Sequence, residues 1–412
     1  MFSILPTSLR LLLASLLWSS HESHEPRSQL SFQLRHSHAV TNTSRVIFAN
    51  EAVSAAFGDE LFTIDTIPIT AHRPPSFSAF SAARTRSIQR LETQALTWLP
   101  IEVPGPDVTK RETLQLLAKM TANAYTQPEQ KDWYDLGSDW NTTYPYGWEP
   151  DADGFRGHIY ASTDNSTVVI SIKGTSLPWI HGGPTTKKDK LNDNLLFSCC
   201  CARVGPTWST VCGCYEGGYK CDSECVEKSL IEESLFYPIG TNLYNNVSYM
   251  YPEANIWVTG HSLGGALSSL LGVTFGVPVV AFEAPGEMMA SHRLHLPSPP
   301  STQHITHVLN TGDPIAMGVC TGIGSTCANA GYAMESRCHL GKIIKYDTIG
   351  KRGWSSNIAN HGINVVIDKV LGEPWEEGQD VPEAIEEEED CAATECLSWT
   401  FGEFRNQTTL NG

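Results

Sequence analysis

A pentapeptide of the form Gly-x-Ser-x-Gly constrains this 412-residue chain more than any other feature. It occupies Gly260–Gly264, between an apolar strand pattern at Ile256–Thr259 and an Ala- and Leu-rich helix pattern at Ala266–Gly276. A strand that turns this sharply into a helix needs small residues beside the serine and leaves the serine hydroxyl exposed. The start of the helix favours negative charge that develops there. We therefore predict that Ser262 is a nucleophile; the alternative is a serine that only caps a helix.

Strand and helix patterns alternate along the middle of the chain. A hairpin is predicted from Gly157–Ala161 and Val168–Ile172, with its turn at Thr163–Ser166. Two further strands are expected at Pro278–Phe282 and His304–Leu309. Because strands alternate with helices, we expect an α/β fold with a parallel-rich sheet and helices on both faces.

A serine nucleophile needs a base, and the base needs an acid that orients it. The sharp turn from strand to helix that carries a catalytic serine is called a nucleophile elbow. After such an elbow, the acid ends a strand and the base follows in a loop beyond the acid. Asp313 follows the strand expected at His304–Leu309, and Glu283, one strand earlier, is the alternative acid. Of the histidines beyond the acid, His339 is next to a cysteine, whereas His361 is in a loop before the last amphipathic segment. We predict Asp313 and His361 as the partners of the serine.

Stabilising the oxyanion requires two backbone N–H donors. One is expected at Leu263, the residue after the nucleophile, and the other in a loop at the end of an earlier strand. The loop Lys173–Ser176 follows the second strand of the predicted hairpin. We therefore place the second donor at Thr175.

The twelve cysteines form three groups along the chain. Cys212-Gly-Cys214 and Cys221-x3-Cys225 could supply thiolates to a metal, but the spacing matches no standard zinc pattern. The sequence therefore predicts disulfides, with their pairing open. The first group, Cys199 to Cys225, forms a cysteine-rich insert between the loop Lys173–Ser176 and the turn at Ser262. The sequence predicts no metal site and no cofactor.

Two features indicate the secretory pathway, where disulfides form. The apolar run Leu11–Trp18 suits a signal peptide, and counted back to Phe2 it nearly reaches the length of a membrane anchor, so both alternatives stay open. Five Asn-x-Ser/Thr sequons are candidate glycosylation sites. They are Asn42, Asn141, Asn165, Asn246 and Asn406.

Composition divides the chain into four expected parts: a signal peptide or anchor at 1–20, an N-terminal luminal segment at 21–104, the catalytic domain at 105–372 and an acidic tail at 373–412. The charge run Glu386–Asp390 predicts that this tail is solvated and disordered. With 28 basic and 45 acidic residues, the formal charge is −17. Because phosphate binding needs clustered Lys and Arg, this charge argues against nucleic-acid binding.

The site residues resemble the class 3 lipase family over roughly residues 110–370. The resemblance rests on the loop Lys173-Gly174-Thr175, the elbow Gly260–Gly265, Asp313-Pro314 and His361. The family commonly has Arg where Lys173 stands. Within the family, the chain most resembles the fungal autophagic-body lipases, on the extended string Thr259–Ala266, the motif Leu116–Met120 and the cysteine-rich insert.

This resemblance implies an α/β-hydrolase fold and a vacuolar hydrolase of membrane phospholipids and triacylglycerol, which degrades autophagic bodies and multivesicular-body vesicles. It further implies a single-pass type II membrane protein of endosomes, multivesicular bodies and the Golgi that is delivered to the vacuole lumen. Two alternatives are an esterase for soluble esters of the feruloyl type and a non-catalytic binding protein on a hydrolase fold. Leu177–Gly183, which contains Trp179, is predicted to be a lid that contacts lipid; the alternative places Trp179 in the core.

Overall fold

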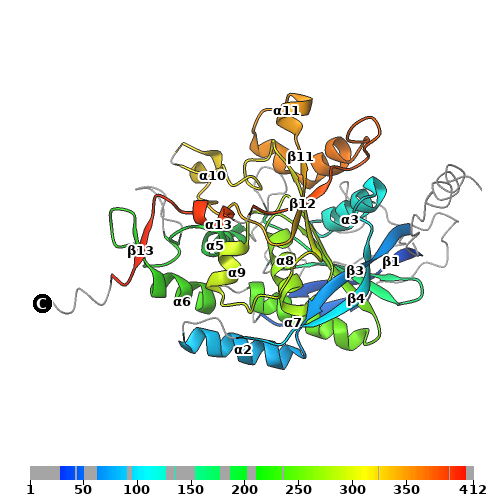
Figure 1. Ribbon diagram of the computed structural model, residues 1–412, viewed down its shortest axis with the longest axis horizontal. Helices are drawn as coiled ribbons and strands as arrows, with labels where there is room; N and C mark the ends of the chain where they lie inside the picture. Colours follow the sequence, from blue (N-terminus) through cyan, green and yellow to red (C-terminus); the bar gives the residue numbers. More distant parts are fainter. Residues whose placement is uncertain are drawn as a thin grey trace, which may run out of the picture.

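A sheet of eleven strands organises the computed structural model of this chain (Figure 1). The described residues are 28–41, 44–50, 63–90, 95–126, 134, 154–176, 186–201, 210–233, 236–322, 324–388 and 390–404. The strands found there are β1 (Ser28–Val40), β2 (Val46–Asn50), β3 (Thr63–Arg73), β4 (Leu99–Pro106), β5 (Gly157–Ser162), β6 (Thr167–Ile172), β7 (Lys220–Asp222), β8 (Asn255–His261), β9 (Val279–Phe282), β10 (Ile305–Asn310), β11 (Lys342–Tyr346), β12 (Ala384–Glu386) and β13 (Thr400–Gly402).

The large sheet has the order β12-β11-β10-β9-β8-β6-β5-β1-β3-β4, with β2 beside β1. Its middle is parallel, because β6, β8, β9, β10 and β11 all run in one direction. Antiparallel strands flank this middle on both sides. The predicted hairpin is confirmed as β5 and β6. Together with the sharp turn from β8 into a helix, this order confirms the α/β-hydrolase fold.

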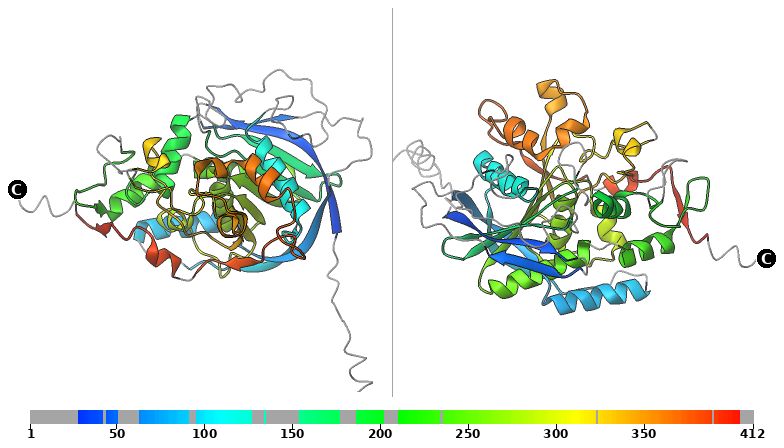
Figure 2. Two further views of the ribbon diagram at one scale, coloured as in Figure 1. Left: turned by 90° about the horizontal axis from the view of Figure 1, so that it is seen from above. Right: turned by 180° about the vertical axis from the view of Figure 1, so that it is seen from behind.

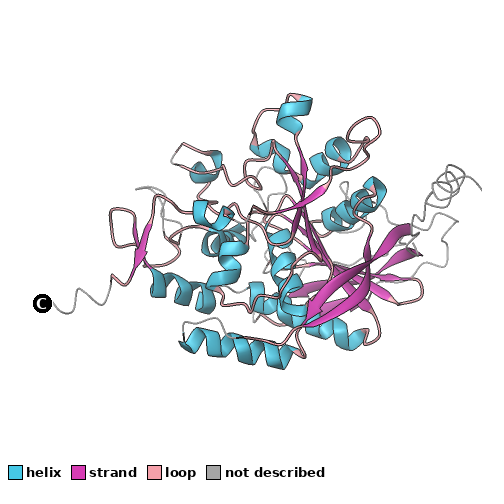
Figure 3. Ribbon diagram, in the orientation of Figure 1, coloured by secondary structure: helices cyan, strands magenta, loops and turns pink. Residues whose placement is uncertain are grey.

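Helices cover both faces of the sheet (Figure 3). Alternate residues of β9 face opposite helix layers. Val279 and Ala281 pack with α7 (Phe236–Met250) and α8 (Leu263–Phe275) on one face. Val280 and Phe282 pack with α3 (Arg111–Asn123), α12 (Ile363–Val365) and η2 (Val366–Val370) on the other. This alternation follows from the two-residue period of a strand. The helices are α2 (Phe77–Arg90), α3 (Arg111–Asn123), α5 (Thr186–Phe197), α6 (Ser223–Glu233), α7 (Phe236–Met250), α8 (Leu263–Phe275), α9 (Met288–Arg293), α10 (Thr326–Asn329), α11 (Thr348–Arg352), η1 (Ile358–His361), α12 (Ile363–Val365), η2 (Val366–Val370) and α13 (Cys391–Thr394).

The N-terminal segment shares the sheet of the hydrolase core wherever it is described. β1 pairs with β5 from Phe32 to His38, and β3 and β4 extend the sheet beyond β1. The domain boundary expected at residue 105 therefore falls inside β4. Among the described helices, none combines the length and the apolar composition needed to cross a bilayer. The signal peptide or anchor predicted at 1–20 lies outside the described residues.

The prediction of a disordered acidic tail is wrong for the part of the tail that is described. β12 pairs with β11, so the start of the charge run is a sheet edge. Cys338–Cys391 and Cys199–Cys396 then attach the segment to the domain. Covalent links and strand pairing thus order a segment whose charges alone would favour solvent.

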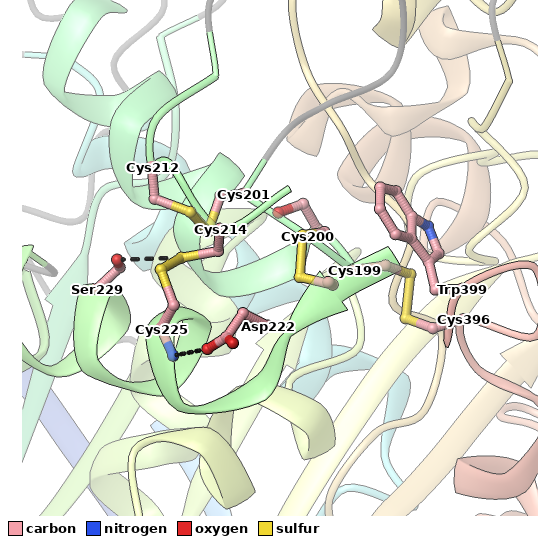
Figure 4. The surroundings of a disulfide bond; sticks show 12 residues. Cys199, Cys200, Cys201, Cys212, Cys214, Asp222, Cys225, Ser229, Cys396 and Trp399 are labelled. Atoms are coloured by element: carbon pink, nitrogen blue, oxygen red, sulfur yellow. Dashed lines mark hydrogen bonds between the residues drawn. A yellow bond between two sulfur atoms is a disulfide. The ribbon is translucent and has the colours of Figure 1, made fainter. Parts of the chain in front are cut away.

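All twelve cysteines form disulfides, which confirms the prediction made for them. Figure 4 shows the crowded insert, where Cys199–Cys396 lies beside Trp399. Cystines make up most of the buried cluster there, so cross-links replace part of an ordinary apolar core. The pairs are Cys199–Cys396, Cys200–Cys221, Cys201–Cys212, Cys214–Cys225, Cys320–Cys327 and Cys338–Cys391. Figures 1 and 2 place β7 and β13, which adjoin this cluster, at the end of the molecule away from β1, β3 and β4.

Removing Cys199–Cys396 by a double change to Ser should lower the free energy of unfolding by about 4–5 kcal/mol. The bond joins residues 197 apart, so it strongly restricts the unfolded chain. Denaturant unfolding measures the loss. The matched control is the double change at Cys320–Cys327, which spans only 7 residues and should cost about 2 kcal/mol. Equal losses in the two variants would contradict the entropic argument.

Candidate active site

Ser262 lies on the turn between β8 and α8 with φ 57° and ψ −129°. This backbone conformation is strained for a residue other than glycine. Its neighbours leave no room for side chains: a Cβ at Gly260 would lie 2.3 Å from the Gly264 carbonyl carbon, and one at Gly264 would lie 2.3 Å from the Ile172 carbonyl oxygen. The glycines of the pentapeptide therefore allow the turn and bring it against the end of β6.

The structure brings Ser262, Asp313 and His361 together. Nε2 of His361 lies 2.9 Å from Oγ of Ser262, and its Nδ1 lies 2.7 Å from Oδ2 of Asp313. All three side chains are buried. Asp313 follows β10, and His361 ends η1. Proton transfer from the hydroxyl to the imidazole, with the carboxylate on the opposite ring nitrogen, is possible in this geometry.

The alternative acid, Glu283, lies behind Asp313, where it supports the carboxylate. Burial raises the pKa of Glu283 well above its ordinary value, and the charge of Asp313 adds to this, so Glu283 is neutral and can donate to Asp313. Its Oε1 accepts hydrogen bonds from the backbone and side chain of Asn310. Burial would also raise the pKa of Asp313, but the charge and hydrogen bond of His361 outweigh it, so the pKa of Asp313 is lowered. The two carboxyl groups thus hold different charge states.

The loop after β6 brings the second predicted oxyanion donor next to the elbow. A Cβ at Gly174 would lie 2.1 Å from the His261 carbonyl oxygen and 3.1 Å from Cβ of Ser262. Thr175 lines the same pocket as Ser262, and Leu263 is the first residue of α8. Both predicted donor residues therefore adjoin the serine, and their role in stabilising an oxyanion stays a prediction.

Two buried acids of α5, which the sequence analysis missed, hold this loop. Oδ2 of Asp189 accepts from Nζ of Lys173 at 3.2 Å and from the Ser176 backbone N–H at 3.0 Å. Oδ2 of Asp193 accepts from Oγ1 of Thr175 at 2.6 Å. Burial, with a contribution from the nearby Asp189, raises the pKa of Asp193 to about 8. The loop is thus supported by the Lys173–Asp189 ion pair and by the neutral acid Asp193.

Asp193→Asn should flatten the dependence of stability on pH. The folded chain keeps a proton on Asp193 up to about pH 8, whereas the unfolded chain loses it near its ordinary pKa of 3.8. Stability from this group therefore falls as pH rises between these values, by up to about 1.4 kcal/mol per pH unit. Between pH 5 and 8 the wild type should lose up to about 4 kcal/mol more than the variant in denaturant unfolding. Asp368→Asn, at an exposed site, is the control, and parallel profiles of wild type and Asp193→Asn would contradict the prediction.

A pocket with a mainly apolar wall opens beside the serine. Its space between atoms is about 350 Å³, part of it open to solvent. The size suits a small ligand or the reactive end of a larger one. The lining residues are Thr175, Asp193, Ser262, Ile315, Cys327, Ala330, Tyr332, Met334, Ile358 and His361.

Two of the five sequons lie in the described residues. Asn165 is exposed in the turn between β5 and β6, with φ 57°. Asn246 lies within α7, where its Nδ2 donates to the Asn242 carbonyl at 2.8 Å. Asn165 is therefore the better placed of the two for a glycan, and all five glycosylation sites stay predictions. Asn42, Asn141, Asn406 and the lid segment Leu177–Gly183 lie outside the described residues.

Comparison with known proteins agrees with the geometry of the elbow. Residues 233–317, which contain the elbow and Asp313, match the family model Lipase (class 3). This chain contains a class 3 lipase domain. The resemblance stated from the sequence is thereby confirmed.

Two relatives of this chain are fungal proteins provisionally named lipase ATG15. That of Cryptococcus neoformans is 58% identical over 288 residues, covering 68% of this chain and 55% of the relative. That of Mycosarcoma maydis is 55% identical over 292 residues, covering 68% and 56%. The chain thus spans about half the length of the curated relatives it matches. Among solved structures, the triacylglyceride lipase of Rhizomucor miehei aligns with this chain at 14% identity and a TM-score of 0.30. The alignment covers 57% of this chain and 78% of the Rhizomucor miehei chain.

The candidate site also contains a buried hydrogen-bond chain that the sequence analysis missed. The Gly174 N–H donates to the Tyr125 hydroxyl at 3.1 Å, and this hydroxyl lies 2.7 Å from Nδ1 of His261. Nε2 of His261 lies 2.7 Å from the backbone carbonyl oxygen of His361. One chain of contacts therefore links the oxyanion loop, the elbow and the candidate base. The histidine of the elbow was its only signal in the sequence.

Proposed function

We propose that this chain is a serine hydrolase that cleaves carboxylic esters of lipids. The observation that carries the proposal is the continuous contact from Asp313 through His361 to Ser262, at 2.7 and 2.9 Å, beside a mainly apolar pocket. The class 3 lipase domain supports it. No cofactor enters this chemistry.

In the proposed reaction, Oγ of Ser262 attacks the ester carbonyl carbon while Nε2 of His361 takes its proton. Asp313 holds the imidazole in the required tautomer and stabilises the imidazolium. The backbone N–H groups of Leu263 and Thr175 stabilise the oxyanion, each by about 10²–10³ in rate. The alcohol leaves with the proton from His361, and water then hydrolyses the acyl-enzyme by the same route.

The proposed substrates are membrane phospholipids and triacylglycerol, broken down in the vacuole. The apolar wall of the pocket, with Ile315, Met334 and Ile358, can contact an acyl chain. The names of the relatives support a lipase. We further propose that residues 1–20 direct the chain into the secretory pathway, as a type II anchor of endosomal, multivesicular-body and Golgi membranes, and that the sequons are glycosylated there.

The test uses purified full chain on two kinds of substrate. A fluorophosphonate probe should label the chain, and hydrolysis should be faster on phospholipid vesicles and triacylglycerol emulsions than on monomeric short esters or feruloyl esters. Faster hydrolysis of feruloyl esters would support a soluble-ester esterase instead. A folded chain that the probe does not label and that hydrolyses neither kind of substrate would support a non-catalytic binding protein.

A further inference from the structure

Three titratable side chains meet in the interior, apart from the proposed catalytic residues. Glu287 immediately precedes α9, His307 is in the middle of β10, and His339 lies in the loop before β11. All three are buried, and their ligand-type atoms lie within 4.8 Å of one another. Burying such groups is unfavourable unless each finds a partner.

Several polar atoms of this cluster have no hydrogen-bond partner among the described residues. They are Oε2 of Glu287 and both ring nitrogens of His307. Nε2 of His307 lies 3.1 Å from Oε1 of Glu287, close enough for an ion pair but not aligned as a hydrogen bond. Leaving a buried polar atom unsatisfied destabilises the fold. One carboxylate oxygen of Glu287 and both ring nitrogens of His307 are therefore available to bind a ligand between these side chains.

We propose that Glu287, His307 and His339 bind one divalent metal ion of the zinc type. Two imidazole nitrogens and a carboxylate oxygen are a donor set that zinc prefers, whereas calcium and magnesium favour oxygen ligands alone. Ligand atoms about 2.1 Å from a tetrahedral zinc lie about 3.4 Å apart. Since the observed separations are at most 4.8 Å, the ligand atoms need to approach one another by no more than about 1.4 Å on binding.

Hydrogen bonds from surrounding groups fix the orientation of two of the proposed ligands, His339 and Glu287. Nε2 of His339 lies 3.0 Å from the Ala284 carbonyl oxygen, so donating there leaves Nδ1 for the metal. Oε1 of Glu287 accepts from Oγ of Ser269 and from the Leu340 N–H, which leaves Oε2 for the metal. Hydrogen bonds from the far side of a ligand to backbone and side-chain groups are the usual support of a zinc site.

A fourth ligand is available from the same neighbourhood. Oε2 of Glu387, which follows β12, lies 3.4 Å from Nδ1 of His339. The adjacent disulfide Cys338–Cys391 ties together the two segments that carry these residues. Bound metal would therefore join α9, β10 and the edge of the sheet, as a structural ion that takes no part in the ester chemistry.

The sequence analysis predicted no metal site because it considered only cysteine patterns. The cysteine group Cys201, Cys212 and Cys214 is close enough to hold a metal, but all three sulfurs are in disulfides. His307 and His339 are 32 residues apart in the sequence and follow no zinc spacing, so only the fold brings them together.

The test measures zinc bound to the purified, oxidised full chain by elemental analysis after dialysis. We expect one zinc per chain, and a melting temperature that falls by at least about 3 °C on removal with phenanthroline and recovers when zinc is restored. His307→Gln and His339→Gln should each bind far less zinc. The matched control is His304→Gln. His304 is buried, immediately precedes β10 and lies outside the cluster, where its Nε2 contacts the Gly272 carbonyl.

Cobalt(II) substitution into the wild type keeps the test independent of whether the variants fold. A tetrahedral cobalt spectrum without a thiolate charge-transfer band would support nitrogen and oxygen ligands. Less than a tenth of an equivalent of zinc, with no change in melting temperature on adding zinc, would overturn the proposal and leave a buried ion pair. Zinc lost equally in His304→Gln and His307→Gln would also overturn the assignment of ligands.

Discussion

Ser262→Ala should lower ester hydrolysis by at least about 10³-fold while the chain folds normally. Alanine fits the same turn, because it adds no atoms where Gly260 and Gly264 leave no space. The change removes only the oxygen that lies 2.9 Å from Nε2 of His361. Hydrolysis of a chromogenic ester and of phospholipid vesicles measures the loss, and circular dichroism reports the fold.

The matched control is Ser268→Ala on α8, the helix that follows Ser262. Oγ of Ser268 is buried and donates to the Gly264 carbonyl, away from the histidine. This variant should keep most of its activity and should still react with a fluorophosphonate. Wild-type activity in Ser262→Ala, or loss of labelling in Ser268→Ala alone, would show that the nucleophile is elsewhere.

Asp313→Asn should lower kcat by about 10⁴-fold, because an amide in place of the carboxylate favours the wrong tautomer of His361. Glu283→Gln should keep activity within about tenfold of the wild type, since a neutral amide can replace a neutral acid as a donor to Asp313. The comparison separates the two candidate acids, and steady-state kinetics with the same esters measures both variants.

Thermal unfolding of both variants serves as the control, because each replaces a buried carboxyl group by an amide of the same shape. An active Asp313→Asn together with an inactive, folded Glu283→Gln would move the acid to Glu283. Equal severe losses in both variants would mean that the two carboxyl groups act as one unit. The expected asymmetry follows from their charge states, with Asp313 ionised beside His361 and Glu283 protonated by burial.

The local features of this chain were readable from the sequence because each depends on neighbours in the chain. The elbow, the hairpin of β5 and β6, and the strands that precede Glu283 and Asp313 all follow from short patterns of apolar and small residues. The oxidised state of the cysteines followed from compartment signals. The order serine, acid, histidine then left His361 as the favoured base.

Other features depend on which distant segments meet, and only the tertiary structure decides that. β1, β3 and β4 have few continuous apolar residues, so their place in the sheet depends on pairing rather than on their own pattern. β1 pairs with β5, β3 with β1, and β4 with β3. The acidic segment after residue 373 was expected to be disordered from its charge, yet strand pairing with β11 and two disulfides order its described part.

In the candidate site, too, some features follow from local sequence and others only from the tertiary structure. The sequence by itself determined which residue types could form a nucleophile, base and acid, since these follow ordered local motifs. The fold decided that Glu283 lies behind Asp313, that Asp193 supports Thr175, and that Glu287 meets His307. These contacts join residues from different strands and helices, and burial then sets their charges, so no periodicity along the chain can encode them.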